Sequence, residues 1–94
     1  MRSYELVCVI QPDLDETAFN SVIEKVKGWI SESGGTVDKV DIWGRRKMAY
    51  IIKKHREGQY VLLNMTMSPS ATFDLERNLR YQEPIIRHML SVAG

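Results

Sequence analysis

The chain has 94 residues, of which 44% are hydrophobic and 27% are charged, and 13 Lys and Arg against 12 Asp and Glu give a net charge of +1. This size and balance predict one globular domain spanning residues 1–94, with little room for a deep enclosed pocket. No apolar run approaches the roughly 20 residues of a membrane helix, and no signal or transit peptide is evident. Cys8 is the single cysteine and has no partner for a disulfide. For these reasons we expect a cytoplasmic protein.

Residues 3–10 predict a first strand. Its alternation places Tyr4, Leu6, Cys8 and Ile10 on one face of a sheet, and Glu5, Val7 and Val9 on the other. A helix is expected next, with Asp15 as its cap and Gly34-Gly35 at its end. Its apolar residues recur at helical spacing: Phe19, Val22, Ile23, Val26, Trp29 and Ile30. Cys8, in its apolar run, is predicted to be a core residue and not a nucleophile.

The middle of the chain predicts a long hairpin. A second strand begins at residue 36, its alternation slips between Val37 and Val40, and after a kink or bulge at Gly44 it continues to Lys53. Residues 55–58 are predicted to form the turn and residues 59–67 the third strand. Val61, Leu63, Met65 and Met67 would share one face of that strand, and Tyr60, Leu62, Asn64 and Thr66 the other.

The last third predicts a second helix and a fourth strand. Ser68 is expected to cap the helix with Pro69 at its first position, and Pro84 prevents it from continuing into the strand at 85–92. The order β-α-β-β-α-β predicts the α+β class: a ferredoxin-like sandwich with a four-stranded antiparallel sheet and both helices on one face.

The sheet face without helices is predicted to be apolar. On the expected register it carries a group of residues that we predict to form a protein-partner face: Val7, Val9, Tyr60, Leu62 and Met89. Uncovered apolar patches of this kind often mark interaction sites.

Charge is segregated along the hairpin. Residues 45–56 contain six Lys or Arg and no acidic residue, with an apolar stretch between two basic clusters. This pattern suits contact with a polyanion, because each cation near a phosphate can displace a counterion. It is also typical of a solvated edge strand whose charges prevent aggregation, and the pattern alone leaves both interpretations open.

Three segments resemble one known family, the bacterial-type small-subunit ribosomal protein S6 family. Residues 1–6 (MRSYEL) are similar to its opening, and residues 44–54 (GRRKMAYIIKK) to its central Gly-x-Arg-x-Leu-Ala-Tyr-Pro-Ile-x-Lys element. Residues 79–89 (LRYQEPIIRHM) resemble its C-terminal Leu-Arg-x-x-(acid) element. The three segments occur in the family's order and at matching spacings, and the resemblance covers nearly the whole chain.

The resemblance implies a ferredoxin-like fold and a structural, non-catalytic role in the small ribosomal subunit. It implies binding to the central domain of small-subunit ribosomal RNA together with ribosomal protein S18, with no cofactor, metal or small-molecule substrate. The basic residues at matching motif positions are the expected RNA contacts: Arg2, Arg45, Arg46, Lys47, Lys53, Lys54 and Arg87.

Two departures from the family pattern have consequences. Ile51 stands where the family usually has Pro, so an edge strand loses the protection that a missing amide gives. The sequence ends at Gly94, without the longer tail that many members carry, which puts contacts made by such a tail in doubt.

Other functions are less consistent with the sequence. His55 and His88 lack metal-ligand spacing, and helix capping accounts for the acidic residues 13–16. RNA-recognition modules of this strand order stack bases on two aromatic residues, but Leu62 stands where the second ring is expected, and Trp43 fits a core, surface or RNA-stacking role equally. The alternative is a small ligand-binding or acylphosphatase-like domain, although residues 11–15 form an acidic loop without Gly, which is unsuited to phosphate.

Overall fold

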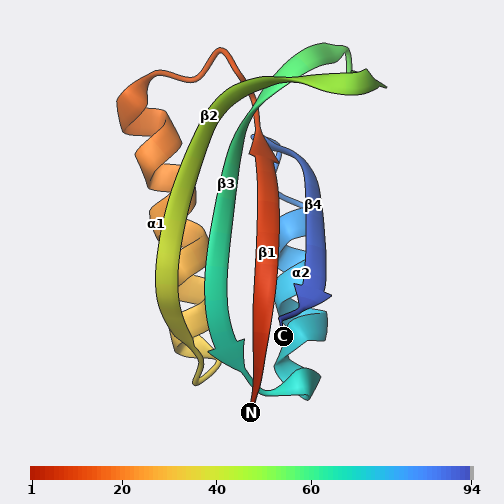
Figure 1. Cartoon of the computed structure of the whole chain (residues 1–94). Coiled ribbons are helices and arrows are strands. Elements are labelled where there is room, and N and C mark those ends of the chain that lie inside the picture. The colour runs from red at the N-terminus through yellow and green to blue at the C-terminus, as the bar shows by residue number, and fades with distance from the viewer. Residues whose placement is uncertain (94) are drawn as a thin grey trace.

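Four antiparallel strands form one sheet in the order β2-β3-β1-β4, and both helices lie against the same face of it (Figure 1). The computed structural model describes residues 1–93, so Gly94, where the sequence ends, lies outside the described residues. The elements in chain order are β1 (Arg2–Ile10), α1 (Glu16–Glu32), β2 (Thr36–Ile52), β3 (His55–Met67), the 3₁₀ turn η1 (Pro69–Ala71), α2 (Thr72–Arg80) and β4 (Ile85–Val92). The predicted ferredoxin-like sandwich is confirmed.

The core lies between the sheet and the two helices. The predicted alternation of β1 and β3 is confirmed, since the residues expected to face the helices are all buried: Tyr4, Leu6, Cys8, Ile10, Val61, Leu63, Met65 and Met67. From the helices they meet Phe19, Val22, Ile23, Val26, Ile30, Leu75 and Leu79, with Trp29 half-buried at the edge. Burial of these apolar side chains holds helices and sheet together, at roughly 25 cal/mol per Å² removed from water.

Helix α1 begins and ends as its sequence predicts. The carboxylate of Asp15 accepts a hydrogen bond from the amide of Ala18 at 2.8 Å. At the other end the amides of Gly34 and Gly35 donate to the carbonyls of Ser31 and Ile30, both at 3.0 Å. This is a Schellman motif, and the φ of +87° at Gly34 explains why glycine stands there.

Strand β2 is bent at the predicted places. The register with β3 shifts between Val37 and Lys39, which accounts for the slip in alternation, and again between Ile42 and Gly44. Gly44 has a φ of +87°, a conformation that glycine adopts cheaply. The predicted kink at Gly44 is therefore confirmed as a bulge.

The predicted hairpin turn was wrong by a few residues. The turn is Lys53-Lys54, with φ values of 50° and 69°, flanked by the pair Ile52–His55, and residues 55–58 belong to β3. Two-residue turns with positive φ usually contain Asn-Gly or Asp-Gly. Two lysines give no such signal, whereas Gly58 resembled a turn residue and in fact serves a close packing contact.

The second helix also starts differently. Ser68 and Pro69 begin η1, and α2 itself starts only at Thr72. The hydroxyl of Ser68 lies 3.0 Å from that of Ser70 and makes no capping bond to the backbone. The predicted side-chain cap is thus wrong, while Pro at the start of the turn and the strand at 85–92 are confirmed.

Candidate functional site

The β2–β3 hairpin carries most of the cations predicted as contacts and extends beyond the end of the sheet. Figure 1 shows its tip bending over the end of β1 toward the β4 side. Between the paired residues Lys47–Glu57 and Ile52–His55, β2 has four residues (48–51), whereas β3 has only Arg56. These five residues have no ladder partner, so the hairpin carries a wide bulge just before its turn. Ile51 lies in this bulge, where the regular ladder is already interrupted, and this reduces the effect of losing the family's Pro.

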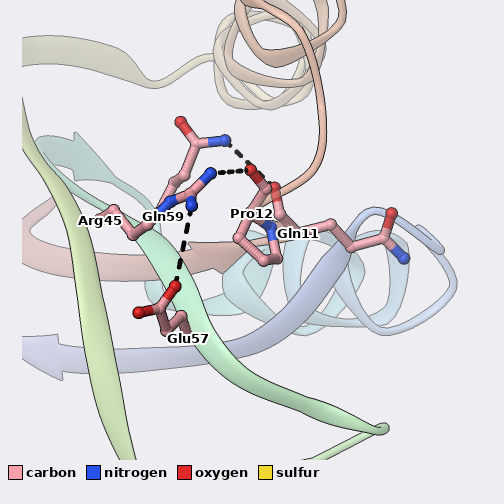
Figure 2. A network of polar contacts seen from close by, with 5 residues as sticks. All are labelled: Gln11, Pro12, Arg45, Glu57 and Gln59. Atoms are coloured by element: carbon pink, nitrogen blue, oxygen red, sulfur yellow. Dashed lines mark hydrogen bonds and ion pairs between the residues drawn. The ribbon is translucent and has the colours of Figure 1, made fainter.

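Arg45 attaches the base of the hairpin to the loop after β1. Its Nη2 donates to the carbonyl oxygen of Pro12 at 2.6 Å, and its Nη1 lies 3.7 Å from a carboxylate oxygen of Glu57 (Figure 2). The side-chain amide of Gln59 donates to the carbonyl of Gln11 at 3.1 Å. Arg45, predicted as an RNA contact, therefore also has two partners within the chain, and its side chain remains 59% exposed.

The same contacts bear on the acylphosphatase-like alternative. The loop after β1 presents the carbonyl oxygens of Gln11 and Pro12 to Arg45 and Gln59, and the carboxylate of Asp15 caps α1. Carbonyl and carboxylate oxygens repel an anion, whereas an anion-cradling loop presents backbone amides. No observation at this loop favours phosphate chemistry.

Arg46 lies on the opposite side of the hairpin, in a stack with two aromatic rings. The rings of Trp43 and Tyr60 are 6.4 Å apart at 9° to one another, and the guanidinium carbon of Arg46 lies 5.1 Å from the centre of the Trp43 ring. Trp43 is 38% exposed. Of the three roles that the sequence left open for Trp43, the core role is excluded, because the bulge at Gly44 brings this ring to the surface beside Tyr60 of the neighbouring strand.

The remaining predicted cations lie at both ends of the sheet. Lys47, Lys53 and Lys54 are exposed on the hairpin, and Nη1 of Arg87 on β4 lies 3.2 Å from the hydroxyl of Tyr50 in the bulge. Arg2 is exposed at the start of β1, where it pairs with Met67 at the far end of the sheet (Figure 1). The structure thus gathers six of the seven residues at the hairpin end and separates Arg2 from them.

The open sheet face is smaller than predicted. Val7, Tyr60 and Leu62 are half-buried and Met89 is 40% exposed, as a face without helices allows. Val9 is only 1% exposed, so its prediction as a residue available to a partner was wrong. The reason is the bend of the hairpin, which brings β3 against Val9 at Gly58.

Cys8 is buried in the core, as predicted. Desolvation raises the pKa of its thiol to about 12. Because the thiolate is the reactive form, this cysteine is unsuited to nucleophilic chemistry near neutral pH.

The described residues give no sign of a metal centre or a membrane segment. In residues 1–93, no group of three or more His, Cys, Asp or Glu side chains is placed to hold a metal ion. Neither helix of that range has the length and apolar character needed to cross a bilayer. His88 lies 3.6 Å from a carboxylate oxygen of Glu76, a contact between β4 and α2.

Comparison with known proteins gives consistent results. A family model described as "Ribosomal protein S6" matches residues 3–91. The "Small ribosomal subunit protein bS6" of Clostridium botulinum (strain Loch Maree / Type A3) is 48% identical over 90 residues, 96% of each chain. The protein of the same name from Clostridium perfringens (strain SM101 / Type A) is also 48% identical over 90 residues, 96% of this chain and 95% of the relative.

Solved structures show the same fold. The crystal structure of the 30S ribosomal protein S6 from Thermotoga maritima superposes with a TM-score of 0.92 at 34% identity, covering 98% of this chain and 87% of that one. The C-terminal domain of the MgtC protein from Mycobacterium tuberculosis superposes with a TM-score of 0.66 at 12% identity, covering 99% and 88%. The second likeness shows the fold alone.

Proposed function

Because this chain belongs to the ribosomal protein S6 family, and is therefore a structural protein of the small ribosomal subunit and not an enzyme, we propose that it binds the central domain of small-subunit rRNA together with ribosomal protein S18. In this proposal the hairpin end contacts RNA and the open sheet face contacts the protein partner. The two surfaces are adjacent, and Arg46 lies where they meet.

The observation that carries the RNA half is the convergence of exposed cations at the hairpin end. Within residues 1–93, no ion pair involves Arg46, Lys47, Lys53, Lys54 or Arg87. Side chains in this state repel one another, and each can exchange a counterion for an RNA phosphate. Arg2, at the opposite end, would contact a separate part of the RNA.

Arg45 has a different place in this proposal. Its bond to Pro12 and its contact with Glu57 fix the orientation of the hairpin, so it positions the neighbouring cations. The carboxylate of Glu57 offsets part of its charge, which makes Arg45 a weaker phosphate ligand than Arg46.

The protein half of the proposal uses the uncovered residues Val7, Tyr60, Leu62 and Met89. The Trp43–Tyr60–Arg46 stack extends this surface with an aromatic and cationic platform. Tyr, Trp and Arg are the residues most enriched where protein interfaces concentrate their binding energy. The stack lies between the two surfaces, where RNA and protein would meet.

Chemical footprinting of the central-domain RNA tests the proposal. The RNA is probed alone, with this protein, with ribosomal protein S18, and with both. We expect a discrete protected region that is strongest with both proteins. An identical footprint with ribosomal protein S18 alone would contradict the proposal.

A further inference from the structure

A hollow of about 220 Å³ lies where the hairpin turn, the end of α2 and the start of β4 meet. Three of its lining residues are cations from these three elements: Lys53 from the turn, Arg80 from the last position of α2, and Arg87 from β4. His88 also lines the hollow, and no acidic residue does. Three basic residues that lie apart in the chain therefore line one small hollow.

The three cations have no anionic partner within the described residues. None of the ion pairs in residues 1–93 involves Lys53, Arg80 or Arg87. Arg87 is oriented by its hydrogen bond to the hydroxyl of Tyr50, at 3.2 Å. The nearby carboxylate of Glu76 is engaged with His88, at 3.6 Å. Three like charges around one hollow repel each other, and an anion placed between them would relieve that repulsion.

We propose that this hollow binds one backbone phosphate of RNA, with Lys53, Arg80 and Arg87 as its ligands. The inference rests on the proposed function and adds to it a defined subsite and a new contact residue, Arg80. The two guanidinium groups offer paired N–H donors that match the oxygens of a phosphate, and the lysine adds a compact charge.

The end of α2 makes a weaker, opposing contribution. A helix C-terminus carries roughly −0.5 elementary charge, which repels an anion. Three full positive charges outweigh it. Arg80 alone would be explained as a cation that stabilises the helix dipole, but Lys53 and Arg87 belong to other elements, and that explanation does not extend to them.

The test measures whether Lys53 and Arg80 act on the same phosphate. Arg80→Gln, Lys53→Gln and the double variant are titrated with central-domain RNA in the presence of ribosomal protein S18. We expect each single substitution to lower the affinity several-fold. The affinity loss of the double variant should be clearly smaller than the product of the two single losses. Groups that share one partner are coupled in this way, whereas distant groups act independently.

Two controls are matched to these variants. Arg77→Gln removes an exposed arginine from the same helix, one that pairs with Asp74 at 2.6 Å outside the hollow, and should change affinity less than twofold. Arg2→Gln removes a cation at the far end of the sheet. In a double variant with Lys53→Gln, the affinity loss should therefore equal the product of the two single losses. Thermal melts of every variant verify that the fold is intact.

The inference is overturned if Arg80→Gln behaves like Arg77→Gln, or if the effects of Lys53 and Arg80 multiply as those of Lys53 and Arg2 do. In either case RNA binding by the unsubstituted protein would stand, and only the phosphate subsite would be lost. If the unsubstituted protein itself shows no salt-dependent RNA binding, the proposed function fails, and the inference with it.

Discussion

Gly58 lies so close to Val9 that a Cβ atom added to the glycine would be 2.2 Å from Cγ1 of the valine. The contact joins β3 to β1 at the point where the hairpin leaves the sheet. It explains both the burial of Val9 and the need for glycine in a strand. The direction of the hairpin, and with it the position of the cations, depends on this approach.

Gly58→Ala should therefore destabilise the protein. Overpacking of this kind typically costs about 1–3 kcal/mol, and a thermal or denaturant melt would measure the loss. Gly28→Ala in α1 is the matched control, because nothing lies within 4 Å of its added Cβ. That change should stabilise the protein by about 0.5–1 kcal/mol, as alanine favours a helix. Equal stability of the two variants would contradict the close approach at Gly58.

Cys8→Ala should cost on the order of 1 kcal/mol by removing buried volume, while RNA binding stays intact in the folded protein. A pH series separates the thiol from other effects. The pKa of Cys8 is raised by burial from 9.0 to about 12, so the unfolded chain releases the thiol proton at a lower pH than the folded one. The thiol's contribution to stability is full below pH 9 and is lost as pH rises from 9 toward 12.

Melts between pH 8 and pH 11 would check this. The unsubstituted protein should lose stability over this range more steeply than Cys8→Ala, since the other titrating groups are common to both. Parallel curves, or rapid modification of the native thiol at pH 7, would argue against a buried Cys8.

RNA binding should weaken as salt rises. If about four cations of the hairpin neutralise phosphates, log K should fall against log salt with a slope near −3 to −4. Arg46→Ala should make the slope less steep by about 0.9 and leave stability nearly unchanged. Arg45→Ala should mainly lower stability, by about 0.5–1 kcal/mol for an exposed bond of this type, because it releases the hairpin from Pro12. A slope independent of salt would remove the phosphate role.

Leu62→Asp should weaken binding to ribosomal protein S18 while the domain stays folded. Leu62 is half-buried on the face without helices, and a carboxylate there would be desolvated in an interface without a partner. Asn64→Asp is the control, since it adds the same charge two residues along β3 on the same face. Calorimetry of the protein pair without RNA gives the affinity. Unchanged pairing, or unfolding, in Leu62→Asp would mean that the interface lies elsewhere.

The sequence predicts the local features of the fold well. Strand alternation identifies the core residues of β1 and β3, the Asp15 cap and the Gly34-Gly35 end are both found, and the bulge at Gly44 follows from a glycine in a slipped strand. Each of these depends on neighbouring residues, whose preferences can be read directly from the chain.

Features that depend on distant contacts were missed. The burial of Val9 depends on the bend of a hairpin tip that begins some 40 residues later. Trp43 could not be assigned until its stack with Tyr60, on another strand, was seen. The contact between Arg45 and Pro12 spans 33 positions. Arg80 has the ordinary appearance of a cation at a helix end, and only the tertiary arrangement brings it near Lys53 and Arg87.

The Lys53-Lys54 turn sets two requirements against each other. Each lysine occupies a left-handed conformation that costs a side-chain-bearing residue on the order of 1 kcal/mol. Replacing the pair with Asn-Gly would relieve that strain and remove two positive charges in one step. Selection for thermal stability alone would therefore tend to remove these lysines, whereas selection for binding a polyanion would retain them.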